Sequence, residues 1–201
     1  MALTYVDFYQ NVYQDDKERC DGIVKKIKDA LEKSVFIINN ILLNFTVDKV
    51  DLQKRDLQKI IEMALDHLKI KIEEKNVNII LDIRAKEIIC NDVSMYQVFT
   101  NLINNSIKFT KEKNMQVKIS SFENKGEVVV KISDKGIGID ERKIKTIFNL
   151  KSREDIGDLK VKGHGVGLNI VQRLVDENNG KIFVESELGK GTTFILVFKG
   201  E

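Results

Sequence analysis

Two asparagines and a lysine are the first residues in this sequence whose types and spacing point to chemistry. Asn101, Asn105 and Lys108 stand at positions i, i+4 and i+7, so they share one stripe of a helix predicted over 92–109. An amide oxygen is a hard ligand that suits Mg²⁺, and a nearby lysine suits a phosphate group. Taken alone, a solvated helix face explains the same pattern.

Two glycine-rich segments follow. Residues 133–140 come after a predicted strand, and the Asp134 carboxylate there can accept a hydrogen bond from an exocyclic amine such as that of adenine. Gly136 and Gly138 would let the backbone approach a flat ring. Residues 163–168 alternate glycines before a predicted helix, whose free N–H groups favour an anion. Neither segment completes a dinucleotide-binding fingerprint or a P-loop, and a plain turn or a hinge is the alternative for each.

The surrounding pattern predicts the elements that must position these segments. Strands are expected where apolar residues alternate or run between turn signals, and helices where apolar residues recur at steps of three and four. The expected strands cover 77–83, 115–120, 126–133, 181–187 and 192–198, and the expected helices cover 52–74, 92–109, 141–148 and 166–178. This mixture favours an α+β sandwich in which helices cover one face of a sheet. Residues 149–163 are polar and are expected to form a long loop.

The N-terminal quarter of the chain has a different character. Residues 16–48 contain one glycine and no convincing strand, and their apolar residues follow one face of a long helix. A broad apolar stripe on a solitary helix needs a partner, so a helical hairpin or bundle is expected. We therefore predict two domains, a partial helical hairpin over 1–48 and an α+β domain over 49–201.

Composition excludes several classes of protein. Lys+Arg number 33 and Asp+Glu number 31 among 201 residues, and the net charge of +2 argues against a protein that coats nucleic acid or an anionic membrane. No apolar run approaches the ~18 residues of a membrane span, and the first residues lack the features of a signal peptide. Cys20 and Cys90 form neither a disulfide framework nor a metal cluster, and we expect two reduced thiols in a cytoplasmic protein.

In this order, the segments resemble the ATP-binding domain of sensor histidine kinases, which belongs to a superfamily that includes the gyrase and MutL ATPases. The resemblance covers about residues 52–198. Its N box spans 101–109, its first glycine box 134–138, the start of its F box 147–148, its second glycine box 163–168 and its closing hairpin 191–194. The resemblance implies a Bergerat-type fold, a two-layer α/β sandwich that binds ATP with Mg²⁺.

The resemblance also implies roles for individual residues. Asn105 and Lys108 would be the catalytic residues, since Asn105 would ligate Mg²⁺ with support from Asn101 and Lys108 would contact phosphate. Asp134 would bind the adenine amine, and Thr193 would help through a water. The remaining nucleotide-binding positions would be Gly136, Ile137, Gly138, Lys162, Gly163, His164, Gly165, Val166, Gly167 and Leu168.

The implied activity is transfer of the ATP γ-phosphoryl group to a histidine, for relay to an aspartate of a response-regulator receiver domain, in a full-length protein that is a homodimer. ATPase members of the superfamily carry a glutamate where this chain has Asn101, which cannot act as a base at neutral pH, so rapid ATP hydrolysis is not expected. The family's acceptor histidine lies in a proline-containing box. This chain has no proline, and neither His67 nor His164 lies in such a box.

We therefore expect that this chain cannot autophosphorylate alone, and loss of an upstream acceptor segment is the simplest account. Other functions stay open. A kinase-like protein without an acceptor could bind ATP and regulate a partner by protein interaction, and Ser/Thr protein kinases and true ATPases occur in the same superfamily. The F box departs as well, since Asn149 and Leu150 replace the usual Pro-Phe.

Overall fold

The chain divides into two units, Met1–Lys49 and Val50–Glu201. The computed structural model describes residues 20–27, 30–31, 34, 51–109, 116–144, 147–148 and 167–200. In the first unit all of the described residues are helical, and the Ser34 hydroxyl donates to the Ala30 carbonyl oxygen at 3.0 Å. The helix predicted from apolar periodicity is thus present where this unit is described, and its pairing into a hairpin stays a prediction.

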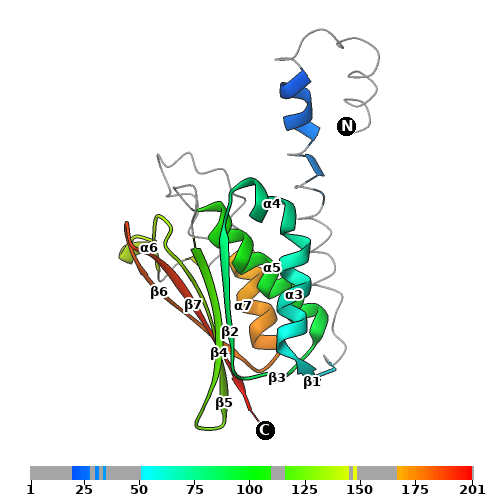
Figure 1. Cartoon of the computed structure of the whole chain (residues 1–201), viewed down its shortest axis with the longest axis vertical. Helices are drawn as coiled ribbons and strands as arrows, with labels where there is room; N and C mark the ends of the chain where they lie inside the picture. The colour runs from blue at the N-terminus through cyan, green and yellow to red at the C-terminus, as the bar shows by residue number, and fades with distance from the viewer. Residues whose placement is uncertain are drawn as a thin grey trace. The chain divides into compact units, whose positions relative to one another are not determined.

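The second unit contains a five-stranded mixed sheet (Figure 1). The strand order is β2-β4-β5-β7-β6, in which β2 runs parallel to β4 and the other neighbours are antiparallel. A separate antiparallel pair joins β1 to β3. The bounds are β1 Gln53–Asp56, β2 Asn78–Ile83, β3 Glu87–Cys90, β4 Gln116–Asn124, β5 Glu127–Asp134, β6 Lys181–Glu187 and β7 Gly191–Lys199.

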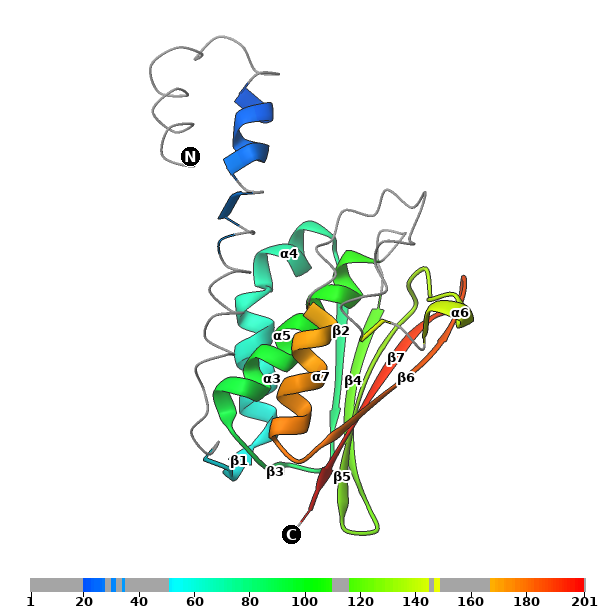
Figure 2. The same cartoon turned by 180° about the vertical axis from the view of Figure 1, so that it is seen from behind.

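Three helices, α3, α5 and α7, lie on one face of this sheet (Figures 1 and 2). The helix bounds are α3 Leu57–His67, α4 Lys69–Glu74, α5 Asp92–Lys108, α6 Glu141–Ile144 and α7 Gly167–Glu177. The unit is therefore the two-layer α/β sandwich that the sequence predicts. Across the ranges that are described, no helix has both the length and the apolar character needed to cross a membrane.

The core lies between the helices and the sheet. On β5 and β7 the buried apolar side chains of the helix-covered face alternate along each strand. They pair across the two strands, as Ile132 does with Phe194. On α5, Phe99 and Leu102 are fully buried. Because strand side chains alternate between faces and helix side chains return every three to four residues, these apolar positions can meet only in one layer.

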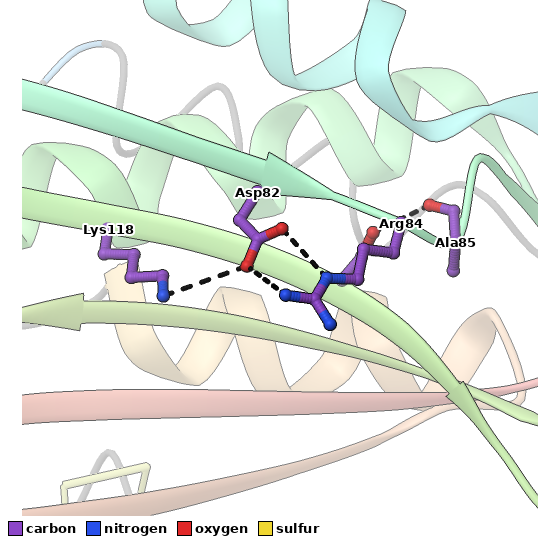
Figure 3. Close-up of polar contacts among 5 residues, drawn as sticks. Asp82, Arg84, Ala85 and Lys118 are labelled. Atoms are coloured by element: carbon purple, nitrogen blue, oxygen red, sulfur yellow. Dashed lines mark hydrogen bonds and ion pairs between the residues drawn. The ribbon is translucent and has the colours of Figure 1, made fainter.

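The opposite face of the sheet carries polar groups. There the Asp82 carboxylate accepts hydrogen bonds from the Arg84 guanidinium at 3.0 and 3.2 Å, and Lys118 Nζ lies 3.9 Å from Asp82 Oδ2 (Figure 3). The hydrogen bond from Arg84 is the largest cause that lowers the pKa of Asp82 below its usual value. Exposed ion pairs of this kind are screened by water and contribute little to stability. The helix-covered face therefore holds the fold together.

Two predicted elements differ from the structure. The helix predicted over 52–74 begins at Leu57 instead, because residues 53–56 form β1, and it is interrupted at the buried Leu68. Strands β1 and β3 were not predicted. Each has four residues, and β1 reads Gln-Lys-Arg-Asp, so its strand conformation depends on pairing with β3 and not on an apolar pattern. Of the helix predicted over 141–148, Glu141–Ile144 form α6 and residues 147–148 form a turn.

A buried asparagine ties the start of α5 to the end of α7. Asn178 is 2% exposed, its Oδ1 accepts the Asn91 backbone N–H at 2.7 Å, and its Nδ2 donates to the Leu174 carbonyl oxygen at 2.7 Å. Asn91 is itself the N-cap of α5, since its side chain accepts the Ser94 N–H at 2.9 Å. One side chain therefore satisfies backbone groups of both helices.

We predict that Asn178→Ala lowers the free energy of unfolding by about 1–3 kcal/mol, because it leaves the half-buried Asn91 N–H without its acceptor. Chemical denaturation followed by circular dichroism measures this change. Asn78→Ala, at an exposed position on the edge strand β2, is the matched control and is expected to change stability by less than about 0.5 kcal/mol. Equal effects of the two substitutions would contradict this role for Asn178.

Candidate functional site

Helix α5 presents the predicted polar stripe beside its buried face. The buried residues of this helix are Met95, Val98, Phe99, Leu102, Ile103, Ser106 and Ile107. Asn101, Asn105 and Lys108 are each half-buried, which is the exposure expected of residues at the rim of a packed face. The packing of the apolar residues thus fixes the direction in which the stripe points.

The structure brings Asn101 against the first residue of α7. The Asn101 Nδ2 donates to the Gln97 carbonyl oxygen at 2.9 Å, and a Cβ added at Gly167 would lie 2.9 Å from Asn101 Oδ1. Glycine at 167 therefore permits this close approach of the two helices. At the C-terminal end of α5, Lys108 Nζ lies 5.5 Å from the centroid of the Phe109 ring.

Asp134, the last residue of β5, joins three segments of the chain. Its Oδ2 accepts the Ser106 hydroxyl of α5 at 3.0 Å, and its Oδ1 accepts the Gly136 N–H at 2.8 Å and the Thr192 N–H of β7 at 3.3 Å. Burial raises the pKa of Asp134 above its usual 3.8, and these three hydrogen bonds act in the opposite direction. The site thus holds a desolvated carboxylate that is oriented by donors on each side.

The loop after β5 is fastened to α5 and to the β6–β7 hairpin. The Ile137 N–H donates to the Phe109 carbonyl oxygen at 3.1 Å, and the Gly189 N–H donates to the Ile137 carbonyl oxygen at 2.7 Å. Gly138 has a φ of +68°, and a Cβ there would collide with the Glu187 carbonyl oxygen, so only glycine fits. The N box, the first glycine box and the closing hairpin therefore meet at one place.

Thr193 does not share this place. It pairs with Ser133 in the register, and its Oγ1 donates to Ser133 Oγ at 3.0 Å on the opposite face of the sheet. Thr192 pairs with Asp134 and is 7% exposed on the helix-covered face. The structure therefore places Thr192, and not the predicted Thr193, beside Asp134, because neighbouring strand residues point to opposite faces.

Part of the predicted site lies outside the described residues, namely Lys162, Gly163, His164, Gly165 and Val166. The last two residues of that segment, Gly167 and Leu168, form the half-buried start of α7. One residue further along, Asn169 Nδ2 donates to the carbonyl oxygen of Phe148 in the F box at 2.9 Å. This bond links the start of α7 to the F box.

Sequence reasoning missed two residues that contact Asp134. Thr192 was passed over for its neighbour Thr193, and Ser106 was not named as a candidate. A serine within an apolar stripe is the signal that could have found Ser106, because a buried hydroxyl needs a hydrogen-bond partner. Its partner proves to be the candidate nucleotide-binding carboxylate.

The mixed sheet is covered on one face by helices, α5 carries the asparagine stripe, and a glycine loop follows the Asp134 carboxylate. Residues 90–201 match the family described as histidine kinase-, DNA gyrase B- and HSP90-like ATPase. The chain belongs to this family.

Individual comparisons agree. The sensor histidine kinase YclK of Bacillus subtilis is 28% identical over 193 residues, which are 91% of this chain and 39% of YclK. Two solved structures show the same fold. Full-length ShkA in complex with AMPPNP has a TM-score of 0.77 at 19% identity, with 100% of this chain and 42% of that one covered. Histidine kinase ThkA in complex with response regulator protein TrrA has a TM-score of 0.74 at 20% identity, with 100% and 57% covered.

The chain spans 21–39% of the length of the curated relatives it matches.

We predict that Asp134→Asn stabilises the α+β unit relative to the parent chain, and increasingly so as the pH rises from 4 to 8. The pKa of Asp134 is raised in the folded state, so the folded protein binds this proton more tightly than the unfolded chain does. Its ionisation therefore removes stability as the pH rises from 3.8 through the higher folded value. Asparagine cannot ionise, and it retains an oxygen that can accept the Gly136 N–H. Denaturation at several pH values measures the difference.

Asp140→Asn provides the control of opposite sign. The Arg142 side chain lowers the pKa of Asp140 to about 2, so its ionised form adds stability that is lost only as the pH falls from 3.8 towards 2. Asp140→Asn is therefore expected to lower stability above pH 4. If the two variants respond to pH in the same direction, the assignment of a penalised carboxylate at Asp134 is wrong.

Proposed function

We propose that this chain is the ATP-binding catalytic part of a two-component sensor histidine kinase. It would transfer the γ-phosphoryl group of ATP to a nitrogen of an acceptor histidine, with ADP as the leaving group, and a response-regulator aspartate would then receive the phosphoryl group. The single observation that carries the proposal is the meeting of three segments at Asp134. There the end of α5, the glycine loop and β7 surround one oriented carboxylate.

The residues present fit an adenine nucleotide. Each oxygen of a carboxylate can accept two hydrogen bonds, and Oδ2 of Asp134 accepts only the Ser106 hydroxyl among the hydrogen bonds of the described residues. It can therefore accept an exocyclic amine as well. Gly136 and Gly138 would line the base, because side chains at these positions are excluded. Ile137 and Leu168 are both half-buried and are proposed as apolar walls.

The phosphates would extend along the polar stripe of α5. Asn105 is the proposed ligand of Mg²⁺, and Lys108 is the proposed phosphate contact, with the glycines at 163, 165 and 167 as further N–H donors. Among the described residues no group of three His, Cys, Asp or Glu side chains could hold a metal ion. A cation at Asn105 would therefore need phosphate oxygens as further ligands, which suits Mg²⁺. When bound, Mg²⁺ would neutralise charge on the phosphates.

A kinase that waits for its acceptor must not transfer phosphate to water. Asn101 occupies the position of the general base in the ATPase members, and an amide cannot take a proton at neutral pH. In this structure its amide is engaged instead with the Gln97 carbonyl oxygen and faces Gly167. We therefore assign Asn101 a supporting role in packing α5 against α7.

The acceptor histidine is proposed to be neither His67 nor His164. His67 lies at the end of α3 with its ring edge-on to Tyr96, at a centroid distance of 6.1 Å. Residues 1–48 are proposed as part of a dimerisation hairpin of a homodimer, and 49–201 as the catalytic domain. The likeness to ThkA in complex with response regulator TrrA supports a receiver-domain partner. A cytoplasmic location is proposed from the expected reduced state of Cys20 and Cys90.

We predict that Asn105→Ala lowers the affinity for ATP in the presence of Mg²⁺ by about 10–100-fold, as expected for the loss of one interaction with a charged partner. Without Mg²⁺ the ATP affinities of the parent chain and of Asn105→Ala should differ much less. Isothermal titration calorimetry of the purified chain measures both affinities. Asn104→Ala is the matched control, because the neighbouring amide accepts Lys71 Nζ at 3.0 Å instead. Equal losses of ATP affinity in Asn105→Ala and Asn104→Ala would show that Asn105 is not the ligand of the cation.

We predict that incubation with γ-labelled Mg-ATP leaves no stable label on this chain, and that free ATP is not turned over steadily. A histidine-containing hairpin segment from a related kinase, supplied separately, should become labelled in an Asn105-dependent manner. Binding of ATP without any labelled acceptor would favour the second candidate, a module that binds ATP and regulates a partner. Steady hydrolysis that is lost in Asn105→Ala would identify an ATPase instead.

A further inference from the structure

Ser106 is the exception in the buried face of α5. It is 2% exposed, and the other buried residues of this helix are apolar. Serine within a helix commonly donates to the carbonyl oxygen four residues earlier. Here its hydroxyl donates to Oδ2 of Asp134 at 3.0 Å, on a different element. A buried hydroxyl directed at a half-buried carboxylate is a specific arrangement, because a polar group without a partner is costly to bury.

The two oxygens of Asp134 are held in different ways. Oδ1 accepts two backbone N–H groups, from Gly136 and Thr192, and its position is therefore set by the loop and the sheet. Oδ2 accepts a hydrogen bond from the side-chain hydroxyl of Ser106. The rotation of the carboxylate about its Cβ–Cγ bond is thus fixed at Oδ1 by backbone N–H groups. At Oδ2 it is fixed by one side-chain hydroxyl, which a substitution can remove.

We propose that Ser106 is a positioning residue that holds Oδ2 of Asp134 as an acceptor for the base and thereby sets the preference for a 6-amino purine over a 6-oxo purine. The inference rests on the proposed nucleotide-binding function. An ionised carboxylate accepts from a 6-amino group but repels a 6-oxo group, which is itself an acceptor. A carboxyl that has gained a proton can donate to that oxygen, and a carboxylate that has rotated no longer presents Oδ2 to the base, so either change weakens the discrimination.

The protonation state of Asp134 is coupled to the same hydrogen bond. Burial raises the pKa of this carboxyl, and donation by Ser106 opposes the rise. The elements packed against Asp134 turn neutral groups towards it, namely Ser106 of α5, Val117 of β4 and Thr192 of β7. The nearest lysines in sequence are Lys135, which is exposed, and Lys131, which is half-buried. Removal of the hydroxyl should therefore raise the pKa of Asp134 further.

The test compares ATP with ITP, which carry the same triphosphate and differ at the purine 6-position. Affinities for the parent chain, Ser106→Ala and Ser133→Ala are measured with Mg²⁺ at pH 8. Ser133→Ala is the matched control, because that serine adjoins Asp134 in the chain but bonds Thr193 on the opposite sheet face. The carbon NMR signal of the Asp134 carboxyl is followed from pH 3 to 9 without nucleotide, which reports its pKa independently of binding.

We expect the parent chain and Ser133→Ala to prefer ATP by more than ~100-fold, since the site has an acceptor that ITP leaves unmatched. Ser106→Ala should lower ATP affinity about tenfold and reduce the preference by a similar factor, as for one hydrogen bond to a charged group. Its Asp134 should titrate at a higher pH. If Ser106→Ala does not fold, Ser106→Cys replaces it, because a thiol is a weaker donor of similar size.

The proposal is overturned if Ser106→Ala keeps the ATP preference of Ser133→Ala, or if its Asp134 titrates as in the parent chain. A loss of affinity with unchanged preference and unchanged titration would indicate a purely structural role and would also overturn it. Failure of the proposed function gives a different result, because the parent chain itself would then bind neither nucleotide.

Discussion

The packing of α5 against the helix-covered face of the sheet is the constraint on which the site depends. Phe99 and Leu102 are fully buried, and the helix can place them there in only one rotation about its axis. That rotation leaves Asn101 and Asn105 at the rim and turns Ser106 inward to Asp134. The same apolar contacts that stabilise the domain therefore aim its polar stripe, and no separate interaction is needed to orient it.

Asp134 shows the cost of such a site. A carboxylate at the end of a buried strand disfavours its own ionised form, and the three hydrogen bonds from Ser106, Gly136 and Thr192 offset only part of this penalty. The fold retains an ionisable group there although burial disfavours its charged form. Local rules of protein stability are commonly violated at functional sites, and this residue is one place among the described residues where the present structure departs from them.

Most of the architecture was predictable because periodicity is a local property. Helix α5 and strand β6 begin where the sequence pattern places them, since apolar spacing and turn residues act over a few neighbours. Strands β1 and β3 were not predictable in this way, because each is short and is stabilised by the other across more than 30 residues of chain. The motifs of the family could likewise be identified from the sequence, because they are defined by the type and order of their glycines and asparagines.

The sequence by itself determined the class of fold, the family and the identities of Asn105, Asp134 and Gly138 as candidate residues. Only the tertiary structure decided which threonine accompanies Asp134. Thr192 and Thr193 are identical and adjacent, and the register of β7 against β5 assigns them to opposite faces. It also decided that Ser106 donates to Asp134 and not within its own helix. Both outcomes depend on contacts between distant segments, and a linear pattern contains no information about which face or partner a polar side chain meets.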